Sequence, residues 1–349
     1  MTAPAHLLDY DLPGLEAFFQ TLGERPFRAR QVMHWVYKRG VTEFGAMTDL
    51  SAALRRRLEA AATLELPRVV REQVSRDGTV KLLVELSDAE RVETVLMPEG
   101  DRVTQCVSTQ VGCAMGCAFC RTGTLGLRRH LTAGEIVGQV VVGQRRAGPG
   151  LRVSNVVFMG MGEPLHNLDN VVRAFRILSS DHGLNITRRR LTVSTAGLAD
   201  RIRRLPAEML GSLAVSLNAT TDEVRDRIMP VNRRHPIGEL LEALGEAPLP
   251  ARARYTIEYV LLGGVNDTPE DARRLVRLLS SLRCKVNLIV YNPHPESPFR
   301  RPDPEAVEAF RSHLLRKNLT ATLRRSRGED ILAACGQLKA QDGGPGGAP

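Results

Sequence analysis

Apolar and polar residues follow two different periods along the chain, and the change of period divides the sequence into regions. Residues 1–66 carry apolar residues at helical spacing, interrupted by Gly, Pro and Asp. The pattern predicts helices at 15–22, 28–39 and 51–62. We therefore expect a small helical accessory domain at 1–66, with Trp35 and Tyr37 packed in its core and a basic surface suited to RNA or simply to solvent.

Short β-branched runs follow the helical region. Residues 68–74 and 80–86 flank the turn Arg76-Asp77-Gly78-Thr79, which predicts a hairpin. A third strand is predicted at 92–97, so residues 67–98 are expected to form a small antiparallel β linker region.

Strands and helices alternate from about residue 102. Strands are predicted at 103–110, 153–159, 190–195, 213–217, 255–261, 286–291 and 320–324, and helices at 132–146, 168–179, 269–282 and 304–315. This alternation predicts a parallel sheet with right-handed crossovers, and the units are too few to close an eight-fold barrel. The expected fold is α/β, with an open, partial TIM-like barrel at 99–340. The Gly- and Pro-rich tail at 341–349 is predicted to be disordered.

Charge and composition narrow the class of partner. The formal net charge is +9 and the pI about 9.6, which favours an anionic partner. Nucleic acid fits better than a membrane, because the sequence has no apolar run of membrane length, although a merely basic soluble enzyme has the same composition. The amino terminus lacks an apolar signal core, so we expect a cytoplasmic protein whose six cysteines are ligands or reactive thiols rather than disulfides.

Three of the cysteines are clustered. Cys113, Cys117 and Cys120 form a Cys-x3-Cys-x2-Cys pattern beside Gly112 and Gly116. Closely spaced thiolates bind metals or iron–sulfur clusters, and three ligands would leave one iron of a [4Fe–4S] cluster open. A structural zinc site with Cys106 as fourth ligand is the alternative, but no second cysteine pair follows. The pattern resembles the signature of the radical S-adenosylmethionine (SAM) superfamily.

Polar residues stand where the predicted parallel strands end, which is the face on which ligands bind in such barrels. Met161-Gly162-Glu163-Pro164 follows the second strand, and its backbone edge and carboxylate could hold the ammonium group of SAM. The other candidates are Ser194, Ser216, Leu217, Asn218 and Asn292. Singly each Ser or Asn reads as a turn residue, but together they predict a cofactor pocket.

The whole chain resembles the RlmN/Cfr family of radical SAM methyltransferases. Glu93, Cys106, the cysteine triplet, the Gly-Glu-Pro turn, Ser194, Ser216, Asn292 and the segment 327–338 occur in the order found in that family. The pattern Gln31-x3-Trp35-x-Tyr37 resembles its accessory domain. Asn218 departs from the family, where histidine is expected, and this puts one contact at the cofactor's edge in doubt.

The resemblance implies a mechanism for this chain. Cys113, Cys117 and Cys120 would hold a [4Fe–4S] cluster that binds SAM. Cys335 would take a methyl group from a first SAM, leaving S-adenosylhomocysteine. A second SAM would be cleaved to a deoxyadenosyl radical that abstracts hydrogen from methylated Cys335, and the resulting carbon radical would add to adenine. Glu93 would remove the ring proton, and Cys106 would release the product through a transient disulfide with Cys335. A cross-strand ion pair is the alternative for Glu93.

The resemblance also implies the substrates: C2 of adenine 2503 in 23S rRNA and adenine 37 of some tRNAs. A Cfr-type C8 methyltransferase is the nearest rival, followed by a non-catalytic zinc RNA-binding protein and a radical SAM enzyme for a small metabolite. A reduced ferredoxin or flavodoxin is expected as electron donor, with no membrane partner and a monomeric chain. Four basic stretches are expected to contact RNA phosphates: Arg128-Arg129-His130, the arginines at 188–190, Arg300-Arg301 and Arg324-Arg325.

Overall fold

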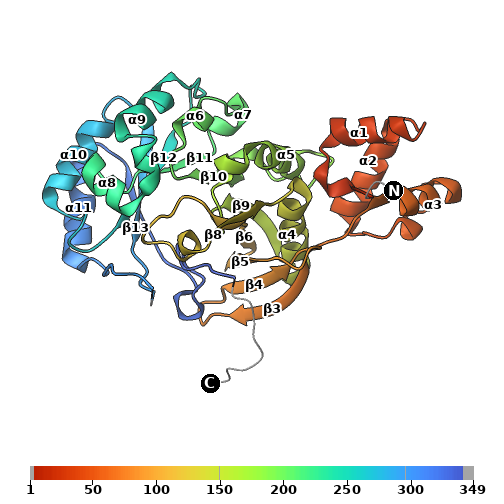
Figure 1. The fold of residues 1–349 in the computed structure, drawn as a ribbon, viewed down its shortest axis with the longest axis horizontal. Helices are drawn as coiled ribbons and strands as arrows, with labels where there is room; N and C mark the ends of the chain where they lie inside the picture. The colour runs from red at the N-terminus through yellow and green to blue at the C-terminus, as the bar shows by residue number, and fades with distance from the viewer. Residues whose placement is uncertain (1–3, 149, 295, 341–349) are drawn as a thin grey trace.

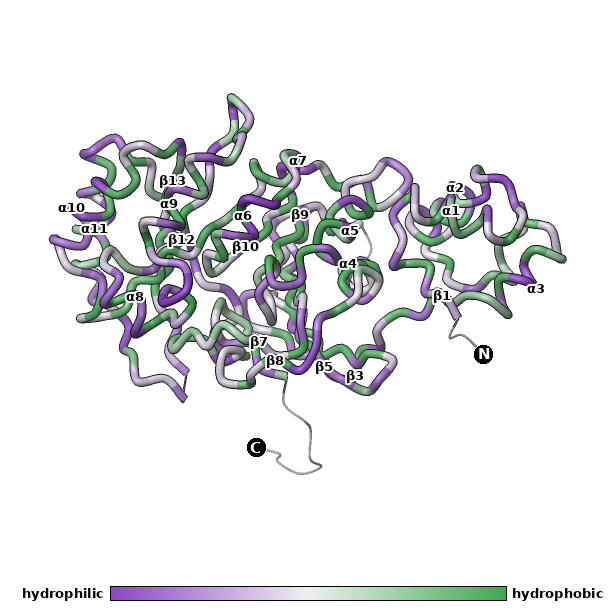
Figure 2. The backbone as a smooth tube through the Cα atoms, turned by 45° about the horizontal axis from the view of Figure 1, so that its top comes forward, coloured by the Kyte–Doolittle hydropathy of each residue, from purple (hydrophilic) through white to green (hydrophobic). Residues whose placement is uncertain are grey.

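The structure is a computed structural model that describes residues 4–148, 150–294 and 296–340. The tail predicted to be disordered, 341–349, lies outside the described residues. The molecule is elongated, with the amino-terminal helices at one end and helices α10 and α11 at the other (Figures 1 and 2). Among the described residues, no helix has both the length and the apolar character needed to cross a membrane.

The amino-terminal region is helical, as predicted. Helices α1 (Leu12–Thr21), α2 (Phe27–Met33) and α3 (Ala52–Ala61) pack around a hydrophobic cluster that includes Phe19, Trp35 and Leu58. Asp11 and Ser51 cap α1 and α3 by accepting backbone N–H groups. The predicted helix 28–39 changes to a π-helical turn at His34–Lys38, and the short strands β1 (Ala5–His6) and β2 (Ala62–Thr63) pair in parallel.

One close approach fixes this helical unit on the barrel. The Oδ1 of Asp9 accepts a hydrogen bond of 2.7 Å from the backbone N of Gly134, at the start of helix α4 (Ala133–Arg146). A negative side chain is favourable there because the helix dipole is positive at its N-terminus. Gly134 has no room for a side chain: a Cβ would lie 2.7 Å from the Nδ1 of His6 and 2.9 Å from Asp9.

A ten-stranded open sheet forms the core. From one edge to the other its strands are β14 (Ala321–Arg324), β13 (Cys284–Val290), β12 (Tyr255–Leu261), β11 (Leu213–Ser216), β10 (Leu191–Thr195), β9 (Arg152–Phe158), β6 (Arg102–Cys106), β5 (Arg91–Glu99), β4 (Val80–Glu85) and β3 (Arg68–Val74). The strands from β6 to β14 pair in parallel, and the sheet is not closed, which confirms the predicted partial barrel. Strands β3 to β5 are the antiparallel edge of this sheet rather than a sheet of their own, because β5 pairs with β6.

Helices connect the parallel strands and lie around the sheet (Figure 1). The long ones fall where they are predicted: α4, α5 (Leu168–Ser179), α10 (Pro269–Leu279) and α11 (Pro304–Arg316). Four shorter helices have no counterpart in the sequence-based expectation: α6 (Ala199–Ile202), α7 (Ala207–Leu210), α8 (Asp222–Ile228) and α9 (Ile237–Glu246).

The predicted first barrel strand, 103–110, is divided in two. The ladder of β6 ends at Cys106, because the backbone N of Ser108 donates to the side chain of Gln139 instead of to a strand. A new strand, β7 (Gln110–Cys113), then pairs antiparallel with β8 (Gly126–His130). The cysteine triplet therefore begins at the last residue of β7 and does not follow the barrel strand itself.

The tight contact at Gly134 yields a stability prediction. We expect Gly134→Ala to lower the free energy of unfolding by about 1–3 kcal/mol, because the added methyl overpacks the contact with His6 and Asp9. Gly238 is a matched control, since it is likewise the second residue of its helix but would have no atom within 4 Å of an added Cβ. Gly238→Ala should raise stability by about 0.5–1 kcal/mol. Equal urea-unfolding curves for the two variants would contradict the described contact.

Candidate active site

The main cavity opens at the carboxyl ends of the parallel strands and has an open volume of about 910 Å³. Ten of the predicted site residues line it: Cys113, Cys117, Cys120, Gly162, Glu163, Ser194, Ser216, Asn218, Asn292 and Cys335. Leu217 is not among them, because its buried side chain belongs to the hydrophobic core. Cys106 and Glu93 also lie outside this cavity.

The loop that carries the three cysteines is held by backbone contacts. Gly112 has a φ of +75°, and a Cβ there would lie 1.9 Å from the carbonyl oxygen of Gly126, so only glycine fits. The backbone N of Ala118 donates to the carbonyl oxygen of Ile228, at the end of α8, over 2.9 Å. These contacts fix the path of the backbone on either side of Cys113 and Cys117.

The environment of these thiols suits a cationic cluster. Burial raises the pKa of Cys113 to about 12 and the pKa of Cys117 well above its usual value, and the neighbouring cysteines add to the rise for both. Thiols that ionise poorly by themselves become ligands when a metal supplies the compensating positive charge. Among the described residues, no three His, Cys, Asp or Glu side chains gather closely enough for a single metal ion.

The turn at Gly162 and Glu163 supplies a carboxyl group beside the cysteines. Gly162 has a φ of +104°, and a Cβ there would lie 2.6 Å from the Cβ of Gln110. The carboxyl of Glu163 accepts from the backbone N of Ala196 over 2.7 Å and from Leu165 over 3.0 Å. Burial nevertheless raises its pKa to about 7. A cationic ligand group in the cavity would reverse this rise.

The polar residues at the other strand ends differ in what they already bind. Asn218 has a φ of +56°, and its Oδ1 accepts from the backbone N of Val260 over 2.8 Å. The Oδ1 of Asn292 accepts from Ser326 over 2.7 Å. Ser194 donates to the Oε2 of Glu258 over 3.1 Å. Glu258 was not among the residues expected from the sequence, although an acid within the apolar strand 255–261 is a signal that could have identified it.

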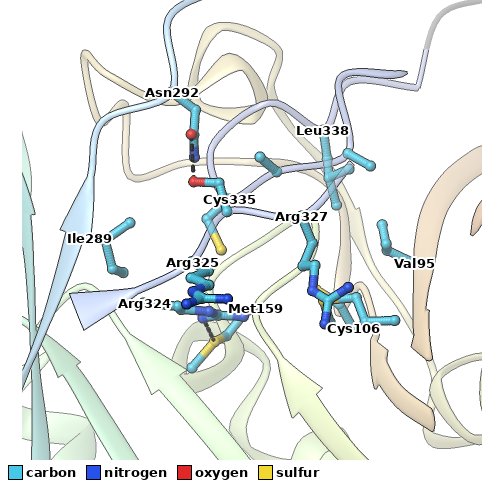
Figure 3. A pocket seen from close by; sticks show the side chains of 14 residues that line it. Val95, Cys106, Met159, Ile289, Asn292, Arg324, Arg325, Arg327, Cys335 and Leu338 are labelled. Carbon is cyan, nitrogen blue, oxygen red and sulfur yellow. Dashed lines mark hydrogen bonds between the residues drawn. The ribbon is translucent and has the colours of Figure 1, made fainter. Parts of the chain in front are cut away.

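A second cavity brings Cys335 and Cys106 together, as the resemblance leads us to expect (Figure 3). The sulfur of Cys335 points toward Met159 and Arg324, and Cys106 lies on the far wall. Burial, then the proximity of Cys335, raises the pKa of Cys106 to about 12. The nearby Cys335 thiol raises the pKa of Arg324. Both cysteines are free thiols, and Cys335 lines the two cavities at once.

Glu93 occupies a buried ion pair. Its Oε1 lies 3.2 Å from the Nζ of Lys81, and each side chain is only 8% exposed. Its Oε2 accepts from the backbone N of Lys339 over 2.8 Å. The ion pair expected as the alternative is therefore present, and the segment that carries Cys335 covers this carboxylate.

Comparisons with known proteins place the chain in a family. Residues 5–64 match the profile of the ribosomal RNA large subunit methyltransferase N-terminal domain, and residues 107–279 that of the radical SAM superfamily. The dual-specificity RNA methyltransferase RlmN of Geobacter sulfurreducens is 54% identical, over 93% of this chain and 89% of that protein. RlmN of Syntrophobacter fumaroxidans is 49% identical, and the match covers 97% of this chain and 99% of that protein.

A solved structure agrees with these sequence relatives. The crystal structure of a radical SAM methyltransferase from Sphaerobacter thermophilus superposes with a TM-score of 0.88 at 46% identity. The match covers 97% of this chain and 100% of that one. With its cysteine triplet, open barrel and amino-terminal helices, the chain belongs to the RlmN family of radical SAM enzymes.

Proposed function

We propose that this chain, a SAM-dependent RNA methyltransferase of the radical SAM family, methylates C2 of adenine in 23S rRNA and in tRNA through a methylated Cys335. The observation that carries the proposal is the position of Cys335, which lines both the cavity of the cysteine triplet and the cavity of Cys106. The relatives are named dual-specificity RNA methyltransferases, which supports RNA as the substrate class. Adenine 2503 and adenine 37 are the proposed targets.

The main cavity is the proposed binding site for a [4Fe–4S] cluster and SAM. Cys113, Cys117 and Cys120 would hold the cluster, which supplies the electron that cleaves SAM when it is bound. Gly162, Glu163, Ser194, Ser216 and Asn292 would bind SAM, with the Glu163 carboxylate on its ammonium group. Asn218 contributes mainly by shaping the strand end, since its amide oxygen binds Val260, and Leu217 contributes only its backbone. A reduced ferredoxin or flavodoxin is the proposed donor to a monomeric enzyme.

Each remaining group has a proposed task. Cys335 attacks the methyl carbon of one SAM as a thiolate, so that the methyl group passes to its sulfur and S-adenosylhomocysteine leaves. A deoxyadenosyl radical from a second SAM would take one hydrogen atom from that methyl group, and the resulting carbon radical would add to C2 of adenine, which lies between two ring nitrogens and is electron-poor. The adduct would then give up one electron, for which the oxidised cluster would be the acceptor. Glu93 takes the ring proton, for which the segment around Lys339 must move away from its carboxylate. Cys106 then attacks the sulfur of Cys335 as a thiolate, so that the disulfide forms while the bond between that sulfur and the transferred carbon breaks. The carbon stays on the base and takes up one proton to become its methyl group.

These tasks predict different outcomes for three cysteine variants. Wild-type enzyme should give RNA that contains 2-methyladenosine on nucleoside chromatography. Cys335→Ala should give none, and Cys106→Ala should accumulate a covalent adduct between Cys335 and RNA. Cys284→Ala is the control, because that buried thiol lies in neither cavity. Appearance of 8-methyladenosine would contradict the C2 assignment and favour the Cfr-type alternative.

The arginines predicted to bind RNA differ in whether a carboxylate of the protein already pairs with them. Arg128 pairs with Glu90, Arg129 with Asp88 and Glu135, and Arg301 with Glu329. Arg324 faces the second cavity. The three arginines at 188–190 are exposed, and no described carboxylate lies within ion-pair distance of them. They are the best candidates for phosphate contacts that help to hold an unstacked adenine.

The difference between these arginines can be measured through salt dependence. Replacing Arg188, Arg189 and Arg190 by Gln should reduce the slope of log K against log salt for RNA binding by about 2 to 3. Replacing Arg273 and Arg277, which pair with Glu270 on α10, is the control and should leave the slope nearly unchanged. Identical slopes for the wild type and the triple variant would contradict phosphate contacts at 188–190.

A further inference from the structure

Glu258 carries an unused acceptor atom inside the main cavity. Glu258 is only 5% exposed, and its Oε2 accepts a hydrogen bond from the hydroxyl of Ser194. The other oxygen, Oε1, has no hydrogen-bond partner among the described residues. A buried carboxylate oxygen without a donor is costly, and such atoms in native proteins usually have a partner that completes the site.

Polar side chains of the neighbouring strands surround Glu258. Ser216 on β11 pairs with Glu258 on β12, whereas Ser194 on β10 pairs with Ala214 and reaches Glu258 through its hydroxyl. All three line the main cavity. Together they present two hydroxyls and a carboxylate to one ligand on three neighbouring strands.

Two carboxyl groups then stand at different parts of this cavity. The backbone N of Glu163 donates over 2.7 Å to the side chain of Gln110 on β7, the strand that ends at Cys113. Glu258 faces Arg324, which lines the second cavity, at 4.0 Å. Glu163 thus belongs to the end with the cysteine triplet and Glu258 to the end with the second cavity.

The positive charge of Arg324 beside Glu258 determines which kind of hydrogen-bond donor can bind the free carboxylate oxygen. The Nη1 of Arg324 lies 4.0 Å from Oε1, which is too far for a hydrogen bond but close enough to act as a counter-charge (Figure 3 shows this arginine beside Met159). A second cation would be repelled by Arg324. A neutral hydroxyl pair would satisfy the free oxygen without that repulsion.

We propose that Glu258 binds the ribose diol of SAM, its Oε1 accepting from at least one of the two hydroxyls. The inference rests on the proposed function, because SAM is the ligand proposed there for the main cavity. It assigns the nucleoside half of SAM to the end of the cavity away from the cysteine triplet. An ionised carboxylate only accepts hydrogen bonds, and vicinal hydroxyls are the only paired neutral O–H donors that SAM carries. Ser194 holds the carboxylate in place through its other oxygen.

The test measures the dissociation constant of S-adenosylhomocysteine and of its 2′-deoxy and 3′-deoxy analogues by titration calorimetry on the cluster-loaded enzyme. Wild-type enzyme should bind at least one deoxy analogue about 10- to 100-fold more weakly. Glu258→Gln should weaken S-adenosylhomocysteine binding by about tenfold or more, and should not weaken binding of that deoxy analogue further. Thr256→Val, on the same strand but outside the cavity lining, should behave as wild type.

The outcomes separate this inference from the proposed function. Failure of wild-type enzyme to bind S-adenosylhomocysteine at all would overturn the proposed function. Normal binding with no loss for either deoxy analogue would overturn the role of Glu258 alone, and this arm needs no variant to fold. Equal weakening of all three ligands by Glu258→Gln would also overturn it, because the carboxylate would then act on the shape of the cavity and not on a hydroxyl.

Discussion

A single buried arginine joins the strand ends to the cysteine loop. Arg225 on α8 is fully buried, and its five N–H donors are all used. They reach the carbonyl oxygens of Ala196 (2.7 Å), Leu217 (2.9 Å), Ser216 (3.2 Å) and His235 (3.3 Å), and the Oδ1 of Asn232 (2.9 Å). Burial lowers the pKa of Arg225 to about 10, so the group keeps its charge at neutral pH. Removing such a group would leave several buried carbonyls without a donor, at a cost of several kcal/mol.

The same helix connects this arginine to the candidate metal ligands. The last residue of α8, Ile228, accepts the hydrogen bond from Ala118 between Cys117 and Cys120. Because one short helix carries both contacts, the ends of β10 and β11 and the cysteine loop have a fixed relation. The carboxyl-terminal segment completes the arrangement, since Gly336 accepts from the backbone N of Arg121 over 2.8 Å and so places Cys335 at the meeting point of the two cavities.

Much of the fold could be predicted from the sequence, because long apolar runs between turn residues identify the parallel strands directly. The helices α6, α7 and α8 were missed, since four to seven residues are too few to display a helical period. Leu217 was assigned to the cavity with Ser216, but neighbouring residues at the end of a strand point to opposite sides. Arg225 could not be identified, because the charged segment Asp222-Glu223-Val224-Arg225-Asp226 is typical of an exposed surface, and only tertiary packing decides that the arginine is inside.

The proposed function depends on Cys335 carrying a methyl group between the two cavities. The most direct measurement is peptide mass spectrometry of Cys335 in protein expressed and purified without oxygen. We expect an added methyl group on that sulfur, and none on Cys106 or Cys284. An unmodified Cys335 in protein with an intact cluster, even after incubation with SAM, would contradict the proposed function at its central step.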